Sequence, residues 1–178
     1  SFISKLMELD IIYKDVPITE INPQKSKKGL YFIKDNFFRF WFSYCLPYKS
    51  QLEMDNTKFV LTKIQESFIN HISKTYEDIC IEYTLKNEEL LKCGRWWNKN
   101  EEIDIVGVGE DFLIVGECKY TNKKVGIDIL NSLKEKSKQI ELKLPIKKFM
   151  LFSKSGFTDE LIKISLEDRS IKLVENIL

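Results

Sequence analysis

The central part of the chain alternates between short apolar runs and polar turns, a pattern that predicts neighbouring β-strands. The expected strands cover residues 94–97, 102–108 and 112–119. The run 112–116 is wholly apolar, as in a strand buried on both faces, and it then breaks into Glu117-Cys118-Lys119. Residues two apart on a strand share a face, so Glu117 and Lys119 should lie together and Cys118 opposite them.

Helical periodicity predicts the segments on both sides of those strands. A long helix is expected over 57–83, with a break near 73–75. A second helix is expected over 128–142, ending before Pro145, with an apolar stripe that also includes Lys136. A strand at 147–153, a helix at 158–167 and a strand at 171–175 complete the chain. The order helix, three strands, helix, strand, helix, strand predicts an α/β fold with a mixed sheet flanked by helices.

The first part of the chain has a different pattern, and we place the boundary between the two domains at 49/50. A helix is expected at 2–9 and strands at 11–13 and 30–33, with a lysine-bearing turn between the strands. This order is that of the last part of a winged-helix module, or of a packing platform for the next domain. The aromatic segment 37–44 should be a helix, capped by Asp35 or Asn36, that forms core between the two parts.

Composition limits the class of protein. The 178 residues are 43% hydrophobic, enough for one sizeable core. Four cysteines without CxxC spacing, beside one histidine, do not form a zinc pattern and fit a reducing, cytoplasmic compartment. There is no signal-peptide pattern and no bilayer-spanning apolar run, so no membrane partner is expected. The initial Ser1 and the absence of a phosphate-binding loop indicate a fragment or a processed chain.

Charge is distributed unevenly although the net charge is only +1. Residues 50–118 contain 7 basic and 14 acidic side chains, whereas residues 119–154 contain 10 basic and 3 acidic ones. A basic stretch directly after the Glu117–Lys119 strand suits a protein that follows a phosphate backbone. The high lysine content of the whole chain is a second explanation of the same stretch.

The acids that end the two central strands are the candidate metal ligands. Twelve residues separate Asp104 from Glu117, and a hairpin would bring both to the face that carries Lys119. Carboxylates at the end of a buried sheet are costly without a use, and oxygen ligands suit Mg²⁺ or Mn²⁺. Lys119 would act as a cation beside the phosphate, or as a base with a lowered pKa. Two solvated carboxylates and a simple Glu117–Lys119 salt bridge are the alternative.

Five segments in order carry a family resemblance: Tyr-Phe-Ile-Lys-Asp-Asn-Phe-Phe-Arg-Phe-Trp-Phe (31–42), Tyr-Glu-Asp-Ile-Cys (76–80), Gly-Arg-Trp-Trp (94–97), Glu-Ile-Asp-Ile-Val (102–106) and Gly-Glu-Cys-Lys-Tyr (116–120). The chain resembles the PD-(D/E)XK nucleases, which share the restriction-endonuclease-like fold. More narrowly, it resembles the C-terminal nuclease-like region of a family of archaeal and bacterial P-loop ATPases. The preceding segment would be a truncated winged helix.

The resemblance implies a reaction, a cofactor and further ligands. The expected activity is hydrolysis of nucleic acid with Mg²⁺ or Mn²⁺, and DNA is favoured over RNA as the substrate. Its ligands would be Asp104, Glu117, the backbone carbonyl of Cys118 and Glu77, which lies on the first core helix. Asp78 is rotated by ~100° from Glu77 on that helix and is not expected to take part. The implied partner within the same polypeptide is an N-terminal ATPase domain.

Further residues are weaker candidates for contact with nucleic acid. They are Lys136 and Gln139 on the helix after the catalytic strand, Arg95 beside Trp96 and Trp97, and Lys123 and Lys124. Each has a plain alternative as a solvated or structural residue. Glu102, two residues before Asp104, is either a supporting acid or a surface residue.

Two other functions compete with a nuclease. A non-catalytic module would bind nucleic acid or a partner and keep the acids for structure. A regulator would bind duplex DNA through Lys25, Lys27 and Lys28 of the turn and ignore metal. The sequence leaves DNA versus RNA and a homodimer undecided.

Overall fold

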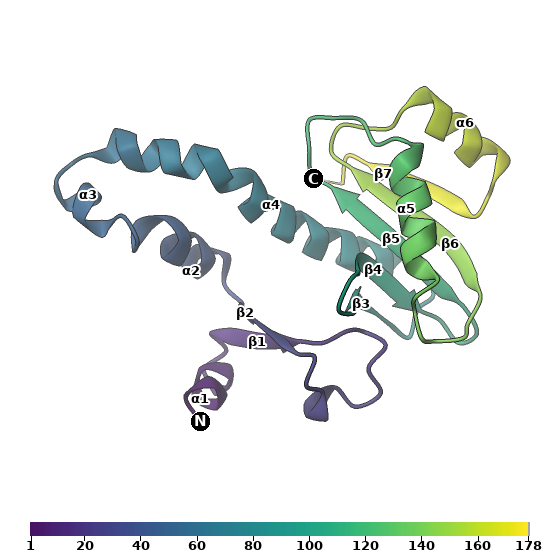
Figure 1. The fold of residues 1–178 in the computed structure, drawn as a ribbon, viewed down its shortest axis with the longest axis horizontal. Coiled ribbons are helices and arrows are strands. Elements are labelled where there is room, and N and C mark those ends of the chain that lie inside the picture. Colours follow the sequence, from purple (N-terminus) through teal and green to yellow (C-terminus); the bar gives the residue numbers. More distant parts are fainter. Residues whose placement is uncertain (178) are drawn as a thin grey trace.

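The computed structural model describes residues 1–177 and contains one five-stranded mixed sheet (Figure 1). Its strands are β3 (Lys92–Trp97), β4 (Glu102–Val108), β5 (Leu113–Lys119), β6 (Ile146–Ser153) and β7 (Ile171–Glu175). They lie in the order β3-β4-β5-β6-β7; β3, β4 and β5 are antiparallel neighbours, and β6 and β7 continue parallel to β5. The expected element order and mixed α/β sheet are confirmed.

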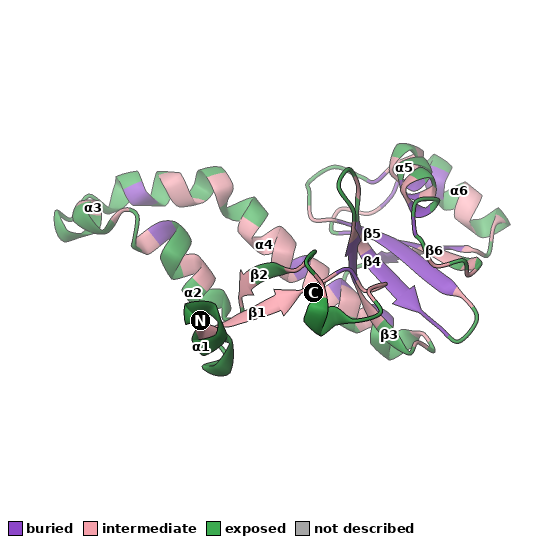
Figure 2. Ribbon diagram, turned by 60° about the horizontal axis from the view of Figure 1, so that its bottom comes forward, coloured by how far each residue is buried: buried purple, intermediate pink, exposed green. Residues whose placement is uncertain are grey.

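Helices cover both faces of this sheet. Helix α4 (Thr57–Asn87) packs on one face, and α5 (Ile127–Ser137) and α6 (Asp159–Glu167) pack on the other. One apolar cluster, which includes Val115, Leu133 and Leu161, lies under α5 and α6, and a second, with Cys80 and Phe152, lies under α4. Figure 2 shows the central strands as the most buried part of the chain. Strand β5 is apolar throughout its first half because both of its faces are covered.

A glycine allows β5 to lie close to its neighbours just before the candidate site. A Cβ atom on Gly116 would lie 3.0 Å from the carbonyl oxygen of Met150 on β6 and 3.2 Å from Cβ of Ile105 on β4. Any side chain here would push the strands apart. Gly116 therefore sets the spacing from which Glu117 projects.

Two helix boundaries differ from the sequence-based expectation. The break near 73–75 is wrong: α4 is continuous over 31 residues, and the Ser73 hydroxyl donates to the Ile69 carbonyl within the helix. Helix α5 ends at Ser137 and not at 142. A turn follows Ser137, and Ile140 in this turn is still buried. None of the helices in residues 1–177 is long and apolar enough to cross a membrane.

The N-terminal elements form a separate, smaller arrangement. They are α1 (Phe2–Glu8), β1 (Ile12–Asp15), the 3₁₀ turn η1 (Pro23–Lys25), β2 (Leu30–Ile33), α2 (Asn36–Phe40), the π-helical η2 (Trp41–Cys45) and α3 (Lys49–Glu53). Strands β1 and β2 pair as an antiparallel hairpin. Asp35 caps α2 by accepting from the Phe38 N–H at 3.0 Å, as predicted.

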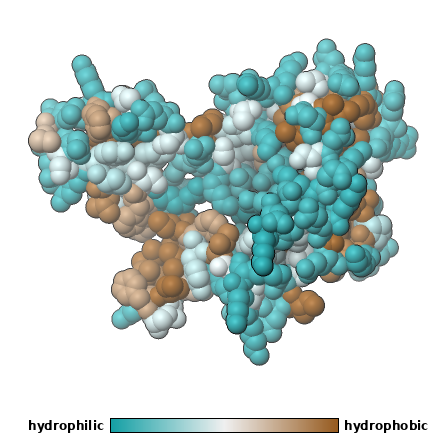
Figure 3. All heavy atoms as spheres, in the orientation of Figure 1, coloured by the Kyte–Doolittle hydropathy of each residue, from teal (hydrophilic) through white to brown (hydrophobic). Residues whose placement is uncertain are grey.

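The aromatic segment of α2 and η2 is not the core that the sequence suggested. Its side chains are largely exposed at Phe37, Phe38, Trp41 and Phe42, and only Tyr44 is buried. On α4, Phe68 and His71 contact the rings of Phe40 and Tyr44, whereas the more exposed rings of the segment contact one another. Figure 3 shows apolar surface gathered over α1 and α2.

The two leucines of α6 test whether the core under α5 and α6 stabilises the domain. Leu161 is 0% exposed and Leu166 is 79% exposed on the same helix. We expect Leu161→Ala to lower the free energy of unfolding by roughly 2–5 kcal/mol and Leu166→Ala by less than about 0.5 kcal/mol. Urea unfolding followed by circular dichroism measures both. Equal effects would contradict the placement of α6 on the sheet.

Candidate metal centre

The ladder between β4 and β5 stops where the candidate acids begin. The last paired residues are Ile105 and Gly116. Beyond them the Cys118 N–H donates to Oδ2 of Asp104 at 2.8 Å, so a side-chain carboxylate replaces the backbone acceptor of β4. The N–H and C=O of one strand residue point to the same neighbour, so the Cys118 carbonyl also faces the Asp104 side. Asp104 and this carbonyl therefore meet at one sheet end.

A β-bulge in β4 aims Asp104 toward that end. Gly94 pairs with Val106 and Trp96 pairs with Ile103, so Asp104 and Ile105 together lie opposite the single residue Arg95. Bulges bend a strand and redirect its side chains, and they recur beside active sites. Here Ile103 joins the apolar cluster under α5 and α6, whereas Ile105 joins the one under α4.

Glu117 is a buried carboxylate between two lysines. It is 7% exposed. Its Oε1 accepts from Lys119 Nζ at 2.7 Å, and its Oε2 lies 3.5 Å from Nζ of Lys136 on α5 without forming a hydrogen bond. Glu117 and Lys119 thus share a face, and the Cys118 side chain packs in the opposite cluster, as predicted. The expected salt bridge exists, but Glu117 is not a solvated hairpin acid.

The electrostatics of the site follow from this burial. Burial, with the negative charge of Glu117, raises the pKa of Asp104 to about 7, although the Cys118 N–H and the Lys119 charge act against the rise. Burial alone would lower the pKa of Lys119, but its hydrogen bond to Glu117 and the two carboxylate charges raise it above its usual value. Without a metal ion, the raised pKa keeps Lys119 a cation, which favours an electrostatic role over that of a base.

The donor atoms fit a hard divalent cation. Oε2 of Glu117 is buried without a hydrogen bond, and the negative charges of Glu117 and Asp104 lie close enough for that of Glu117 to raise the pKa of Asp104 even with Lys119 nearby. Within residues 1–177, no group of three or more His, Cys, Asp and Glu side chains is arranged to hold a metal ion. The pair would supply two oxygens, with a carbonyl and water completing the shell, as Mg²⁺ accepts.

Glu77 is held by cations outside the Asp104–Glu117 pair. Its Oε2 accepts from Arg95 Nε at 3.0 Å and from Lys74 Nζ at 3.3 Å. Glu77 lies near enough to Asp104 to contribute to the raised pKa of that acid. The role of Glu77 as a ligand stays a prediction. Asp78 likewise faces Arg95, at 2.6 Å.

The weaker candidates for contact with nucleic acid lie in different surroundings. Lys136 lies at the site, against Glu117. Gln139 accepts from Asn98 Nδ2 at 2.9 Å. Lys123 and Lys124 are exposed on the loop after β5, where phosphate could reach them. Arg95 is buried among carboxylates and does not face solvent as a phosphate contact would.

Other side chains occupy plain structural positions. Trp96 is buried, as expected for at least one of the two tryptophans. Glu102 is exposed at the start of β4. Glu66 is an exposed partner of Lys63, and the His71 ring stacks on that of Phe68 in the boundary region. None of these extends the candidate site.

Sequence reasoning missed Asp15 and the bulge. Asp15 of β1 lies 3.6 Å from Arg95, but 80 residues separate the two and no motif links them. The bulge had a signal: Ile103, Ile105 and Val106 are all apolar, which breaks strict alternation. An extra residue in the strand accounts for that break.

Replacing Asp104 with Asn tests the raised pKa. The folded state holds a proton that the unfolded state releases near pH 3.8, so the parent should lose stability as pH rises from about 4 through 7. In EDTA, Asp104→Asn should therefore be more stable than the parent at pH 8, by at least about 1 kcal/mol or roughly 2–4 °C, with no gain near pH 4.

Thermal unfolding at a series of pH values measures this difference. Asp111→Asn, at an exposed turn position, is the matched control and should leave the curve unchanged. A variant less stable than the parent at pH 8 would show that the Asp104 charge is net stabilising, contrary to the geometry.

Comparisons with known proteins found one sequence relative and one solved structure with limited similarity. A stretch of 117 residues is 32% identical to the uncharacterized protein MJECL04 of Methanocaldococcus jannaschii, covering 62% of this chain and 26% of that protein. The chain thus spans about a quarter of that relative. Among solved structures, a protein of unknown function, AF1548, is 20% identical over 42% of this chain and 41% of its own, with a TM-score of 0.33.

A family assignment comes from the middle of the chain. Residues 41–140 match DUF234, and the matched range includes α4, the three antiparallel strands and α5, the elements that position Asp104, Glu117 and both lysines. The match covers more than half of the chain. The chain therefore belongs to DUF234, a family described as archaeal and bacterial proteins of unknown function.

Proposed function

We propose that the site at the ends of β4 and β5 hydrolyses phosphodiester bonds of nucleic acid with Mg²⁺ or Mn²⁺. DNA is the favoured substrate over RNA. The supporting observation is the pair of close carboxylates, the half-buried Asp104 and the buried Glu117, beside the cationic Lys119. Such a group is expensive to bury unless it is used. The bound cation would lower the pKa of water and offset charge on the phosphate.

Each residue then has a distinct task. Asp104, fixed by the Cys118 N–H, and Glu117, fixed by Lys119, would hold the cation with oxygen atoms. Lys119 would remain charged and stabilise the negative charge that develops on the phosphate. This assignment favours electrostatic stabilisation over proton abstraction, because the pKa of Lys119 is raised.

Lys136 would join the same site from α5. Its Nζ faces the Glu117 oxygen that has no hydrogen bond, so it is a second cation within reach of a bound phosphate. The exposed Lys123 and Lys124 extend this positive side along the loop after β5. A phosphate backbone would meet cations at the candidate metal site and beside it.

The family resemblance supports the same proposal. Asp104, Glu117 and Lys119 match the D, E and K of the PD-(D/E)XK pattern, and the element order agrees with that fold. The resemblance also suggests that the full polypeptide is an ATPase with this region at its C-terminal end. ATP hydrolysis elsewhere in the polypeptide would then move or gate the nuclease region.

A non-catalytic module is the second candidate, and two observations favour it. Arg95 holds Glu77, the third expected carboxylate ligand, and no group of three acids among residues 1–177 is arranged to hold a metal ion. In this case the region would bind nucleic acid or a partner, and the Asp104–Glu117 pair would serve structure or weak metal binding.

Metal binding separates the two candidates without any substrate. At a Mn²⁺ concentration about 100 times Kd, we expect stabilisation of about 2.7 kcal/mol, or roughly 5–10 °C in Tm. Asp104→Ala and Glu117→Ala should abolish the shift. Glu110→Ala removes an exposed acid from the β4–β5 turn and should keep it. A shift that survives in Asp104→Ala would place the metal elsewhere.

Cleavage tests the activity itself. Labelled duplex, single strand, flap, four-way junction and RNA are incubated with Mg²⁺ or Mn²⁺. Cutting should need metal, and Lys119→Ala and Glu117→Ala should lower its rate by about a hundredfold or more. The control is Lys163→Ala, an exposed lysine of α6. If no substrate is cut and no metal binds, the non-catalytic module is the correct function.

A further inference from the structure

Arg95 is a buried cation outside the Asp104–Glu117–Lys119 group. Its side chain comes from β3 and is 5% exposed. Three carboxylates surround the guanidinium: Glu77 at 3.0 Å from Nε, Asp78 at 2.6 Å from Nη2 and Asp15 at 3.6 Å from Nη1. Lys74 is a second cation of this cluster, with its Nζ 3.3 Å from Oε2 of Glu77, so three acids share two cations.

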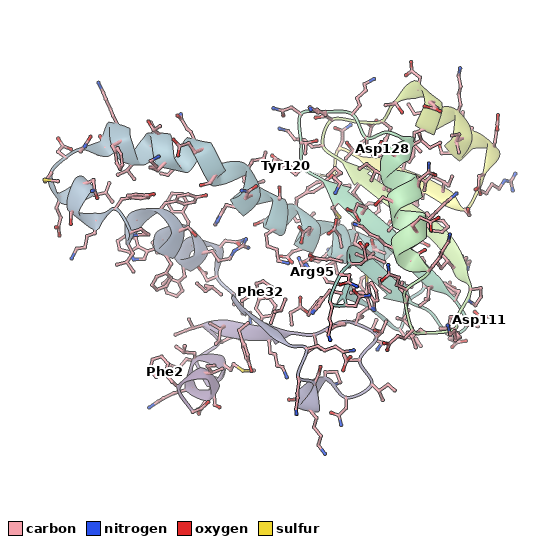
Figure 4. The ribbon with its side chains drawn as sticks, in the orientation of Figure 1. Phe2, Phe32, Arg95, Asp111, Tyr120 and Asp128 are labelled. Carbon is pink, nitrogen blue, oxygen red and sulfur yellow. The ribbon has the colours of Figure 1, made fainter. Side chains whose placement is uncertain are left out.

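The cluster joins three parts of the fold. Asp15 ends strand β1 of the N-terminal hairpin, Glu77 and Asp78 lie on α4, and Arg95 lies on the edge strand of the main sheet. Figure 4 shows Arg95 at the place where the hairpin approaches that sheet. The backbone takes part as well, because the Ile18 N–H donates to the Arg95 carbonyl at 2.8 Å. The side chain and the backbone of Arg95 therefore both contact the hairpin segment.

Arg95 also lies directly opposite the bulge that aims Asp104. On β4, Asp104 and Ile105 face this one residue. A shift of the Arg95 backbone would change how the bulge is accommodated, and a shift of its guanidinium would release Glu77, whose charge Asp104 already senses. The candidate metal site and the hairpin thus share Arg95 as their common contact.

The Asp15 contact is the weakest of the three. Oδ2 of Asp15 is buried and forms no hydrogen bond among the described residues, and it meets Arg95 only as an ion pair. Glu77 and Asp78, by contrast, are hydrogen-bonded to the guanidinium. The Arg95 side chain is therefore held firmly by α4 through two hydrogen bonds. Its ion pair with Asp15 of the hairpin is the contact that is easier to break.

We propose that Arg95 is a positioning residue that couples the β1–β2 hairpin to the Asp104–Glu117 site, so that loosening the contact between Arg95 and the hairpin lowers metal affinity and turnover there. The effect on turnover rests on the proposed nuclease function. The mechanical coupling between hairpin and β4 does not, and it can be measured separately.

The test uses two substitutions and a matched control. Asp15→Asn removes one charge from the cluster, and Arg95→Lys keeps the charge but loses the planar fork that reaches three carboxylates. The control, Asp10→Asn, makes the same chemical change in the N-terminal unit at the exposed Asp10–Lys34 ion pair. Asp10 has a φ of 58°, which asparagine accepts.

Hydrogen exchange without metal measures the coupling. We expect Asp15→Asn and Arg95→Lys to speed exchange of the β4 amides around Asp104 relative to those of β6, and Asp10→Asn to leave the ratio unchanged. Calorimetry with Mn²⁺ and cleavage kinetics should show affinity and kcat reduced between about twofold and thirtyfold, with KM nearly constant.

The possible outcomes are distinct. A lower Tm with β4 exchange, Mn²⁺ affinity and kcat all equal to those of the parent would overturn the proposal and leave Arg95 a purely structural residue. If the parent neither binds Mn²⁺ nor cuts nucleic acid, the nuclease function fails, and the exchange ratio alone decides the coupling. A selective rise at β4 supports it even then.

Discussion

A carboxylate inside a protein must be compensated, and the buried Glu117 imposes that requirement on everything around it. Lys119 from the same strand and Lys136 from α5 both converge on it, one on each oxygen. The second carboxylate, Asp104, accepts from the Cys118 N–H, but burial and the negative charge of Glu117 outweigh that hydrogen bond and raise its pKa to about 7. The pattern suits a site that exchanges protein cations and a proton for a metal ion.

The sheet provides this arrangement by stopping its own ladder. Pairing between β4 and β5 ends at Ile105 and Gly116, and the freed Cys118 N–H binds a side chain where a backbone carbonyl would otherwise lie. The bulge opposite Arg95 makes that substitution possible, since it redirects Asp104 without removing β4 from the sheet. Local irregularity and the concentration of charge therefore have one structural origin.

The sequence predicted what depends on neighbours along the chain. The apolar run of β5, the alternation of Glu117, Cys118 and Lys119, and the order of helices and strands all follow from local periodicity, and the structure has them. The failures depend on distant contacts. Whether aromatic rings such as Phe38 and Trp41 are covered is decided by what packs on them, and these two contact neighbouring rings of their own segment and stay about 40% exposed. The meeting of Asp15 with Arg95 likewise follows from how the hairpin docks, which no spacing encodes.

The hairpin itself shows why a charge cluster, and not apolar packing, connects it to the sheet. None of the residues of β1 and β2 is fully buried, so the hairpin has no core of its own. Ile18 packs against the apolar cluster under α5 and α6, and Lys74 of α4 lies over the Phe32 ring of β2. The Arg95 cluster and the backbone hydrogen bond from Ile18 add to these contacts. An element held by few buried groups has a low free energy of local opening. Such an element can respond to a ligand while the main sheet, with its two closed apolar clusters, stays folded. The fold thus keeps Asp104 and Glu117 on the main sheet. It places Asp15, the acid that contacts Arg95 at the longest distance, on the hairpin.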